Sequence, residues 1–189
     1  RPLYCYTCHD KVYAQMINGG FYEFDGQRFH LLLERTAVGN DNVVAILPYG
    51  NSGMVLLTVD SGLFVYEHGT VSALRTDIDA QLRWAKGNRA VMVGDSILAI
   101  GTILDGIYGV DKKGHLLWHL NRDNQLNNNS VMGLFGDREN NLWAALDDGI
   151  SFVHTNTSIT LLTPSVRDLS IGMVYGVERV GEKIYLATN

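Results

Sequence analysis

Two cysteines three residues apart are the first feature that could carry chemistry. Cys5 and Cys8 form a Cys-x-x-Cys, the spacing of redox pairs and of half a zinc site. They lie in an aromatic-rich stretch typical of a strand, which would hold their Cα atoms about 10 Å apart on opposite faces, too far for a disulfide. No second cysteine pair completes a zinc site. We therefore expect two small buried hydrophobic side chains.

The segment 137–141, Asp-Arg-Glu-Asn-Asn, places two carboxylates close together, as in a metal site or an acid/base pair. It lacks the alternating ligands, central glycine and distal Glu of a calcium loop. Because it separates two strand-like runs, we interpret it as a hairpin turn. Asp137 would cap its own backbone, and Asn140 is suited to a positive φ.

Asp105 and Asp148 each directly precede a glycine, at positions typical of tight turns. A structural role in the turn is one interpretation. The other is that both carboxylates accept hydrogen bonds from sugar hydroxyls at a ligand-binding edge of the fold.

Two long connections, 75–89 and 121–130, carry side chains suited to a sugar. The candidate ligand-binding residues are Arg83, Trp84 and Lys86 in the first, and Arg122, Asn124 and Asn128 in the second. Trp84 could stack on a sugar ring while its neighbouring cations meet a carboxylate or sulfate. The alternative is that it packs beneath its own loop. The amides can bind hydroxyl groups, but they are also ordinary loop formers.

The histidines do not form a catalytic constellation. His115 and His119 flank a strand-like run, where residues four apart are about 13 Å distant, too far to ligate one ion. The other four histidines are scattered, and the nucleophile elbow, phosphate loop and His-Glu-x-x-His motifs are absent. We predict no catalytic residue, no metal and no cofactor.

The elements that must position these residues repeat along the chain. Four copies align on a glycine followed by an apolar residue, with spacings of 42, 44 and 43 residues: Gly20, Gly62, Gly106 and Gly149. A repeat of about 40–45 residues is typical of four-stranded propeller blades. Each copy contains four short runs of strand formers joined by turns, which predicts an up-and-down sheet. Many runs are apolar on both faces, so each sheet must be covered on both sides.

We therefore predict an all-β fold, a β-propeller fragment of four four-stranded blades plus the first two strands of a fifth. The partial propeller spans 1–189, with blades at about 2–35, 42–76, 89–121 and 130–163 and a half blade at 173–189. Segment 77–86 could hold one helical turn. We expect the remaining blades of the same protein, or a second copy of the chain in a homodimer, to cover the apolar faces at the ends.

Composition excludes several classes of function. The 189 residues are 46% apolar and carry a net charge of −5, which is unlike a disordered chain and argues against a nucleic-acid partner. The apolar runs are far shorter than the roughly 18–20 residues that span a bilayer, so we expect no direct membrane contact in this segment. Because the sequence begins with Arg1, without a leader, we expect a processed or excised segment.

The fourth copy carries the clearest motif. Residues 129–150 read Asn-Ser-Val-Met-Gly-Leu-Phe-Gly-Asp-Arg-Glu-Asn-Asn-Leu-Trp-Ala-Ala-Leu-Asp-Asp-Gly-Ile. This resembles the two-component regulator propeller repeat, in which a valine strand, an Asp-led turn, Asn-Leu-Trp and a terminal Gly-Leu recur. The other copies match loosely, with Ala14, Leu56 and Ile100 in place of Trp143.

The resemblance implies the periplasmic sensor region of a bacterial hybrid two-component system. In that family two seven-bladed propellers and a small β-sandwich lie outside the inner membrane, followed by one transmembrane helix and cytoplasmic kinase and regulator parts. It implies a ligand-sensing module that recognises oligosaccharide breakdown products or another small molecule, with any histidine kinase activity outside this segment. Two alternatives remain, a propeller-type lyase with rim histidines and acids, and a protein-interaction scaffold.

Overall fold

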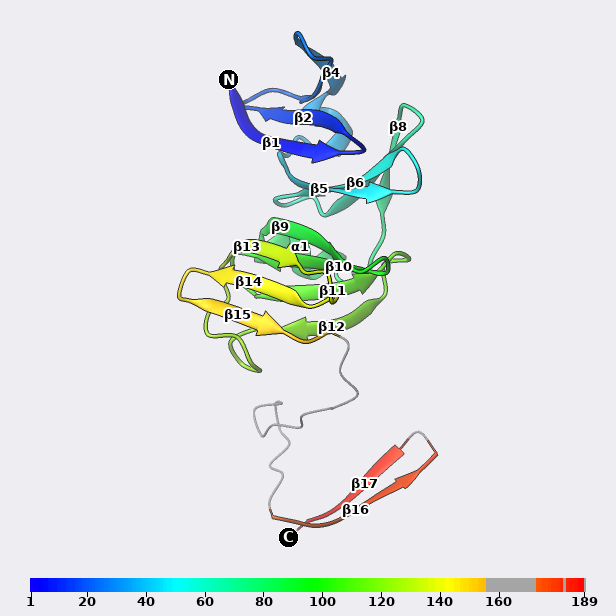
Figure 1. Cartoon of the computed structure of the whole chain (residues 1–189), viewed down its shortest axis with the longest axis vertical. Helices are drawn as coiled ribbons and strands as arrows, with labels where there is room; N and C mark the ends of the chain where they lie inside the picture. Colours follow the sequence, from blue (N-terminus) through cyan, green and yellow to red (C-terminus); the bar gives the residue numbers. More distant parts are fainter. Residues whose placement is uncertain (156–172, 182, 189) are drawn as a thin grey trace. The chain divides into compact units, whose positions relative to one another are not determined.

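The computed structural model describes residues 1–155, 173–181 and 183–188. The chain divides into two compact units, Arg1–Thr157 and Ser158–Asn189, which we describe separately. Strands dominate both units, so the predicted all-β class is confirmed (Figure 1).

The first unit contains four antiparallel sheets, each built from consecutive strands in chain order. The first sheet consists of β1 (Pro2–Cys8), β2 (Lys11–Met16), β3 (Phe21–Phe24) and β4 (Phe29–Leu33). The second consists of β5 (Val43–Tyr49), β6 (Gly53–Thr58), β7 (Leu63–Glu67) and β8 (Thr70–Leu74). The third consists of β9 (Gly87–Val93), β10 (Ile97–Thr102), β11 (Ile107–Asp111) and β12 (Leu116–Leu120). The fourth consists of β13 (Val131–Gly136), β14 (Leu142–Leu146) and β15 (Ile150–Val153).

These sheets are successive propeller blades. Their first strands adjoin one another, β1 next to β5, β5 next to β9, and β9 next to β13. Each pair of neighbouring sheets encloses an apolar core, represented by Phe21 with Leu56, Leu57 with Tyr108, and Ile107 with Leu142. All six residues of β6 are buried, which confirms that an inner sheet is covered on both faces.

The repeated glycines serve the turns between the second and third strands. Gly62, Gly106 and Gly149 have φ values of 87°, 73° and 86°, in the left-handed region that glycine adopts without a steric penalty. Gly20 has a different reason, because a Cβ there would overlap the carbonyl oxygen of Leu33. Gly62, Gly106 and Gly149 therefore meet the same backbone requirement, whereas Gly20 meets a packing requirement.

The second unit contains β16 (Val174–Val180) and β17 (Lys183–Thr188), paired antiparallel with Val177 opposite Leu186. This two-stranded sheet confirms the predicted half blade. The fourth strand expected for the blade at about 130–163 would follow β15 and lies outside the described residues.

Two local expectations need correction. Cys5 is exposed rather than buried, because strand alternation places it on the face of β1 opposite Cys8, whose side chain joins the core shared with the second sheet. The single helical turn expected in 77–86 is the seven-residue helix α1 (Asp79–Ala85), about two turns long. A short 3₁₀ helix, η1 (Arg35–Val38), occupies the first connection. No helix among the described residues is long and apolar enough to span a membrane.

Candidate functional site

One end of the first unit holds the eight candidate ligand-binding residues proposed from the sequence. In an up-and-down sheet the tips between the second and third strands lie at the same end as the links to the next sheet. We call this end the connection rim. It consists of the hairpin tips 17–20, 59–62, 103–106 and 147–149 and the connections 34–42, 75–86 and 121–130. The eight candidate ligand-binding residues all belong to these segments.

Hydrogen bonds fasten the second hairpin tip to the two connections beside it. The carboxylate of Asp41, which is 9% exposed, accepts the backbone N–H groups of Asp60 and Ser61 at 2.6 and 2.9 Å. From the next connection, Lys86 Nζ lies 2.7 Å from Asp60 Oδ1. Hydrogen bonds to a charged acceptor contribute roughly 1.5–3 kcal/mol each, so Asp41 holds this tip firmly.

The same pattern continues along the rim. The N–H groups of Ile103 and Leu104 donate to Ala85 O at 3.1 and 3.0 Å, which joins the end of α1 to the third hairpin tip. Gly106 N–H donates to Asn129 O, and Asp147 N–H donates to Ser130 O. The connection 121–130 is therefore fixed to the third and fourth tips, which carry Asp105 and Asp148.

Helix α1 presents two of the candidate residues to solvent. Its start is fixed by Asp79, whose Oδ1 accepts the Thr76 N–H at 2.9 Å and the Thr76 hydroxyl at 2.7 Å. Leu82 is buried, and Arg83 and Trp84 lie on the exposed side. Trp84 is 52% exposed, so it does not pack beneath its own loop and its ring is available for stacking.

Asp105 is the centre of a side-chain cluster. Its carboxylate accepts the hydroxyl of Tyr108 and, at 3.2 Å, the Asn121 side-chain amide, and its backbone oxygen lies 2.8 Å from His119 Nε2. Burial and the neighbouring Asp105 carboxylate raise the pKa of Tyr108 well above its ordinary value. These contacts order the third hairpin tip and leave Asp105 little free hydrogen-bonding capacity.

The remaining candidates form two groups: side chains that hydrogen-bond within their own loop, and side chains that are exposed with no such bond among the described residues. Asn124 accepts the Asn121 N–H at 2.7 Å and donates to His119 O at 2.9 Å, and Asn128 accepts the Ser130 N–H at 2.8 Å. Both amides therefore shape their own loop. The Arg122 guanidinium and the Asp148 carboxylate are exposed. Among the candidates, Arg83, Trp84, Arg122 and Asp148 offer free functional groups at the rim.

One charged residue near the rim was missed at the sequence level. Arg89, on the innermost strand β9, lines a cavity of about 310 Å³ together with Tyr4, Tyr6 and Cys5 of β1. Its guanidinium donates to the backbone and side-chain oxygens of Asn88 at 2.8 and 3.1 Å. An arginine at the start of an inner apolar strand is the signal that could have identified it.

The histidines do not assemble an acid/base site. Only His119 lies at the connection rim. His30 and His115 pair with Asp25 and Asp111 at turns on the opposite edge of their sheets. His115 and His119 therefore have separate partners, as their strand spacing predicted. No group of three or more histidine, cysteine or acidic side chains within the described part of the chain could hold a metal ion.

Comparison with known proteins identifies the fold. No family model and no curated protein matches the sequence. Among solved structures, the extracellular domain of the hybrid two component system BT3049 from B. thetaiotaomicron superimposes with a TM-score of 0.65 at 21% identity. The match covers 100% of this chain and 25% of that domain. The extracellular domain of BT4673 from the same organism gives a TM-score of 0.60 at 19% identity, covering 95% and 25%.

A third match, BamB from Moraxella catarrhalis, has a TM-score of 0.55 at 15% identity and covers 82% of this chain and 45% of that protein. At these identities the comparisons establish the fold. The chain spans about a quarter of the length of the two hybrid-system domains.

Proposed function

We propose that this chain is a ligand-sensing propeller module of an extracytoplasmic two-component sensor and that its connection rim recognises oligosaccharide breakdown products. The observation that carries the proposal is the fold match along the entire chain to an extracellular domain of a hybrid two component system. The Asn-Leu-Trp repeat of the fourth blade supports the same assignment.

The chemistry of the rim suits a sugar ligand. Trp84 offers an exposed aromatic face on a helix whose position is fixed by hydrogen bonds to the third hairpin tip. Arg83 and Arg122 offer charged donors for a carboxylate or sulfate, and Asp148 offers an acceptor for hydroxyls. A rigid rim with a few free polar groups is what selective binding of a polar ligand requires.

Signalling follows from differential binding. A ligand that contacts the rim more favourably in one arrangement of the propellers shifts the population toward it and passes a rigid-body movement onward. In this proposal the module lies in the periplasm, its parent protein is anchored in the inner membrane, and the kinase and regulator parts lie outside this segment. The module itself has no turnover.

A glycan screen tests the proposal. We expect neutral and acidic oligosaccharides from a library to include at least one that raises the melting temperature and changes tryptophan fluorescence, since Trp84 is one of three tryptophans. Trp84→Ala and Arg83→Gln should abolish both signals. Arg138→Gln, in the 137–141 turn on the opposite edge, is the matched control and should bind normally. Absence of any glycan response, or equal loss in the control, would contradict the proposal.

A further inference from the structure

A cavity of about 480 Å³ lies between the second and third blades. Its apolar walls come from both sheets, with Val55 and Leu74 from the second and Met92 and Leu98 from the third. Val55 and Leu98 belong to the core between these blades. The cavity is therefore a place where that core opens toward the surface.

The turns after the first strands differ from blade to blade. Between the first and second blades, His9 Nε2 lies 2.9 Å from Gly53 O, and a hollow of about 410 Å³ is lined by His9 and by Pro48 of the second blade. Between the third and fourth, the turn after β9 lies close to the side chain of Asn140. Between the second and third, Gly50 of the turn after β5 lines the cavity together with Pro48 and Tyr49.

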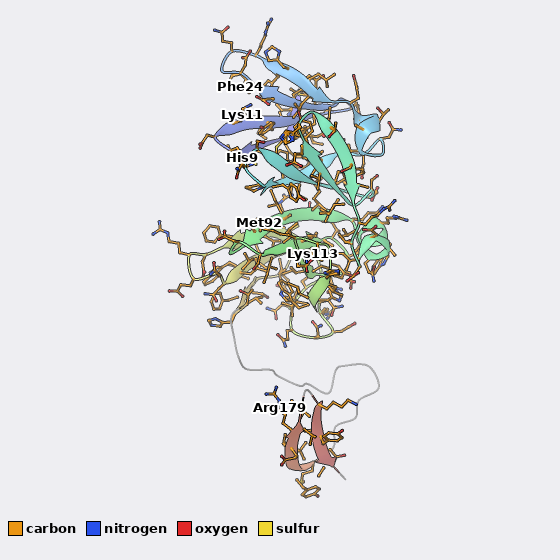
Figure 2. The ribbon with its side chains drawn as sticks, turned by 90° about the vertical axis from the view of Figure 1, so that its right-hand side faces the viewer. His9, Lys11, Phe24, Met92, Lys113 and Arg179 are labelled. Atoms are coloured by element: carbon orange, nitrogen blue, oxygen red, sulfur yellow. The ribbon has the colours of Figure 1, made fainter. Side chains whose placement is uncertain are left out.

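Two lysines lie at the mouth of the cavity. Lys112 and Lys113, in the turn between β11 and β12, line it together with Tyr49. Figure 2 labels Lys113 and Met92 of the lining. Neither lysine forms an ion pair with any residue that the structure describes. Two carboxylates lie near these residues: Asp111 Oδ1 accepts the Lys113 N–H at 2.8 Å, and Glu67 Oε1 would lie 3.8 Å from a Cβ at Gly50. Asp111 also accepts the His115 N–H and pairs with the His115 ring, so it is held by its own turn and the two ammonium groups remain available to a ligand anion.

We infer that this interblade cavity binds a small organic anion with an aromatic or aliphatic body, its apolar part against Met92 and Leu98 and its anionic group at Lys112 and Lys113. The volume lies in the range of small-molecule sites, about 300–1,000 Å³, and such sites combine apolar walls with a few convergent polar groups. The inference does not depend on glycan binding at the connection rim.

Three probes separate the contributions of charge and apolar surface. Naphthalene-2-carboxylate carries both, naphthalene-2-carboxamide lacks the charge, and acetate lacks the apolar body. In the intact chain labelled at its methionine methyl groups, naphthalene-2-carboxylate should shift the Met92 resonance, assigned with Met92→Leu. The resonance of Met132, exposed on the fourth sheet, should not move. The carboxamide should bind about tenfold more weakly, and acetate should cause no shift.

Charge variants complete the test. The double variant Lys112→Gln, Lys113→Gln should weaken naphthalene-2-carboxylate about tenfold, since exposed ion pairs are each worth a few tenths to 1 kcal/mol. Glu67→Gln should tighten binding, and Arg28→Gln, in the exposed turn between β3 and β4 of the first blade, should leave it unchanged. Equal affinity of carboxylate and carboxamide, or a shift of Met132 without Met92, would overturn the proposal while leaving the glycan proposal untouched.

Discussion

The rings of Tyr108 and His119 stack face to face on neighbouring strands, with centroids 4.1 Å apart and planes within 1° of parallel. Both side chains also bond to Asp105, the hydroxyl to its carboxylate and the imidazole to its backbone oxygen. Because a carbonyl oxygen only accepts, His119 carries its proton on Nε2. The stack thus ties the third hairpin tip to the outer strands of its blade.

This arrangement predicts an unusual titration. Burial and the Asp105 carboxylate raise the pKa of Tyr108, so its phenol should stay protonated at about pH 11, where an ordinary tyrosine is largely ionised. The folded wild type and Tyr108→Phe should therefore show the same phenolate absorbance at that pH, with circular dichroism confirming that both are folded. In denaturant the wild type should show one additional ionised tyrosine. A difference of one tyrosine between the folded proteins would contradict the prediction.

Three turn aspartates predict loss of stability in acid. Hydrogen bonds from the Arg28 backbone, the His30 ring and a neighbouring N–H lower the pKa of Asp25 from 3.8 to about 2. Backbone donors also lower the pKa values of Asp111 and Asp137. A lowered folded-state pKa stabilises above the unfolded value, and this contribution disappears as the pH falls from about 4 toward 2.

Urea unfolding between pH 5 and pH 2 checks this direction. We expect the midpoint to fall steeply below about pH 4 in the wild type, and less steeply when Asp25, Asp111 and Asp137 are all replaced by Asn. Carbon-detected titration of the Asp25 carboxyl should give a midpoint near 2. A midpoint at or above 3.8 would show that the turn does not stabilise the carboxylate.

The two cysteines should differ sharply in reactivity. Cys5 is exposed, whereas Cys8 is 5% exposed and burial raises the pKa of its thiol, which reduces the reactive thiolate. A thiol reagent such as Ellman's should titrate one cysteine in the native protein and two in denaturant. Cys5→Ser should abolish the native reaction. If neither cysteine reacts in denaturant without a reductant, a disulfide exists and the strand geometry is wrong.

Local chemistry was predictable from the sequence, and contacts between blades were not. The Asp137 turn formed as expected, with Asn140 at a φ of 63° and the carboxylate accepting the N–H groups of Glu139 and Asn141, because such turns depend on adjacent residues. The exposure of Cys5 and the position of Arg89 depend instead on which sheet covers which face.

The candidate site likewise has one part that could be predicted from the sequence and one part that could not. Strand order alone puts the hairpin tips and the connections at the same end of the sheets, so this grouping could be predicted from the sequence. The sequence could not distinguish the exposed Trp84 from the internally bonded Asn124, since both lie in long connections whose side-chain contacts depend on the fold. The interblade cavity also had no signal in the sequence, because its lining combines residues of two blades that are far apart along the chain.

The inner and outer strands of the third blade differ in burial, and this predicts different responses to truncation. Ile100 on β10 is 0% exposed in the core between the second and third blades, whereas Leu117 on β12 is 50% exposed. Ile100→Ala should lower the free energy of unfolding by about 2–5 kcal/mol, the cost of lost apolar burial and a residual cavity. Leu117→Ala, which removes a similar side chain, should cost less than about 1 kcal/mol. Urea unfolding of the intact chain measures both, and equal costs would show that the blades do not share a packed core.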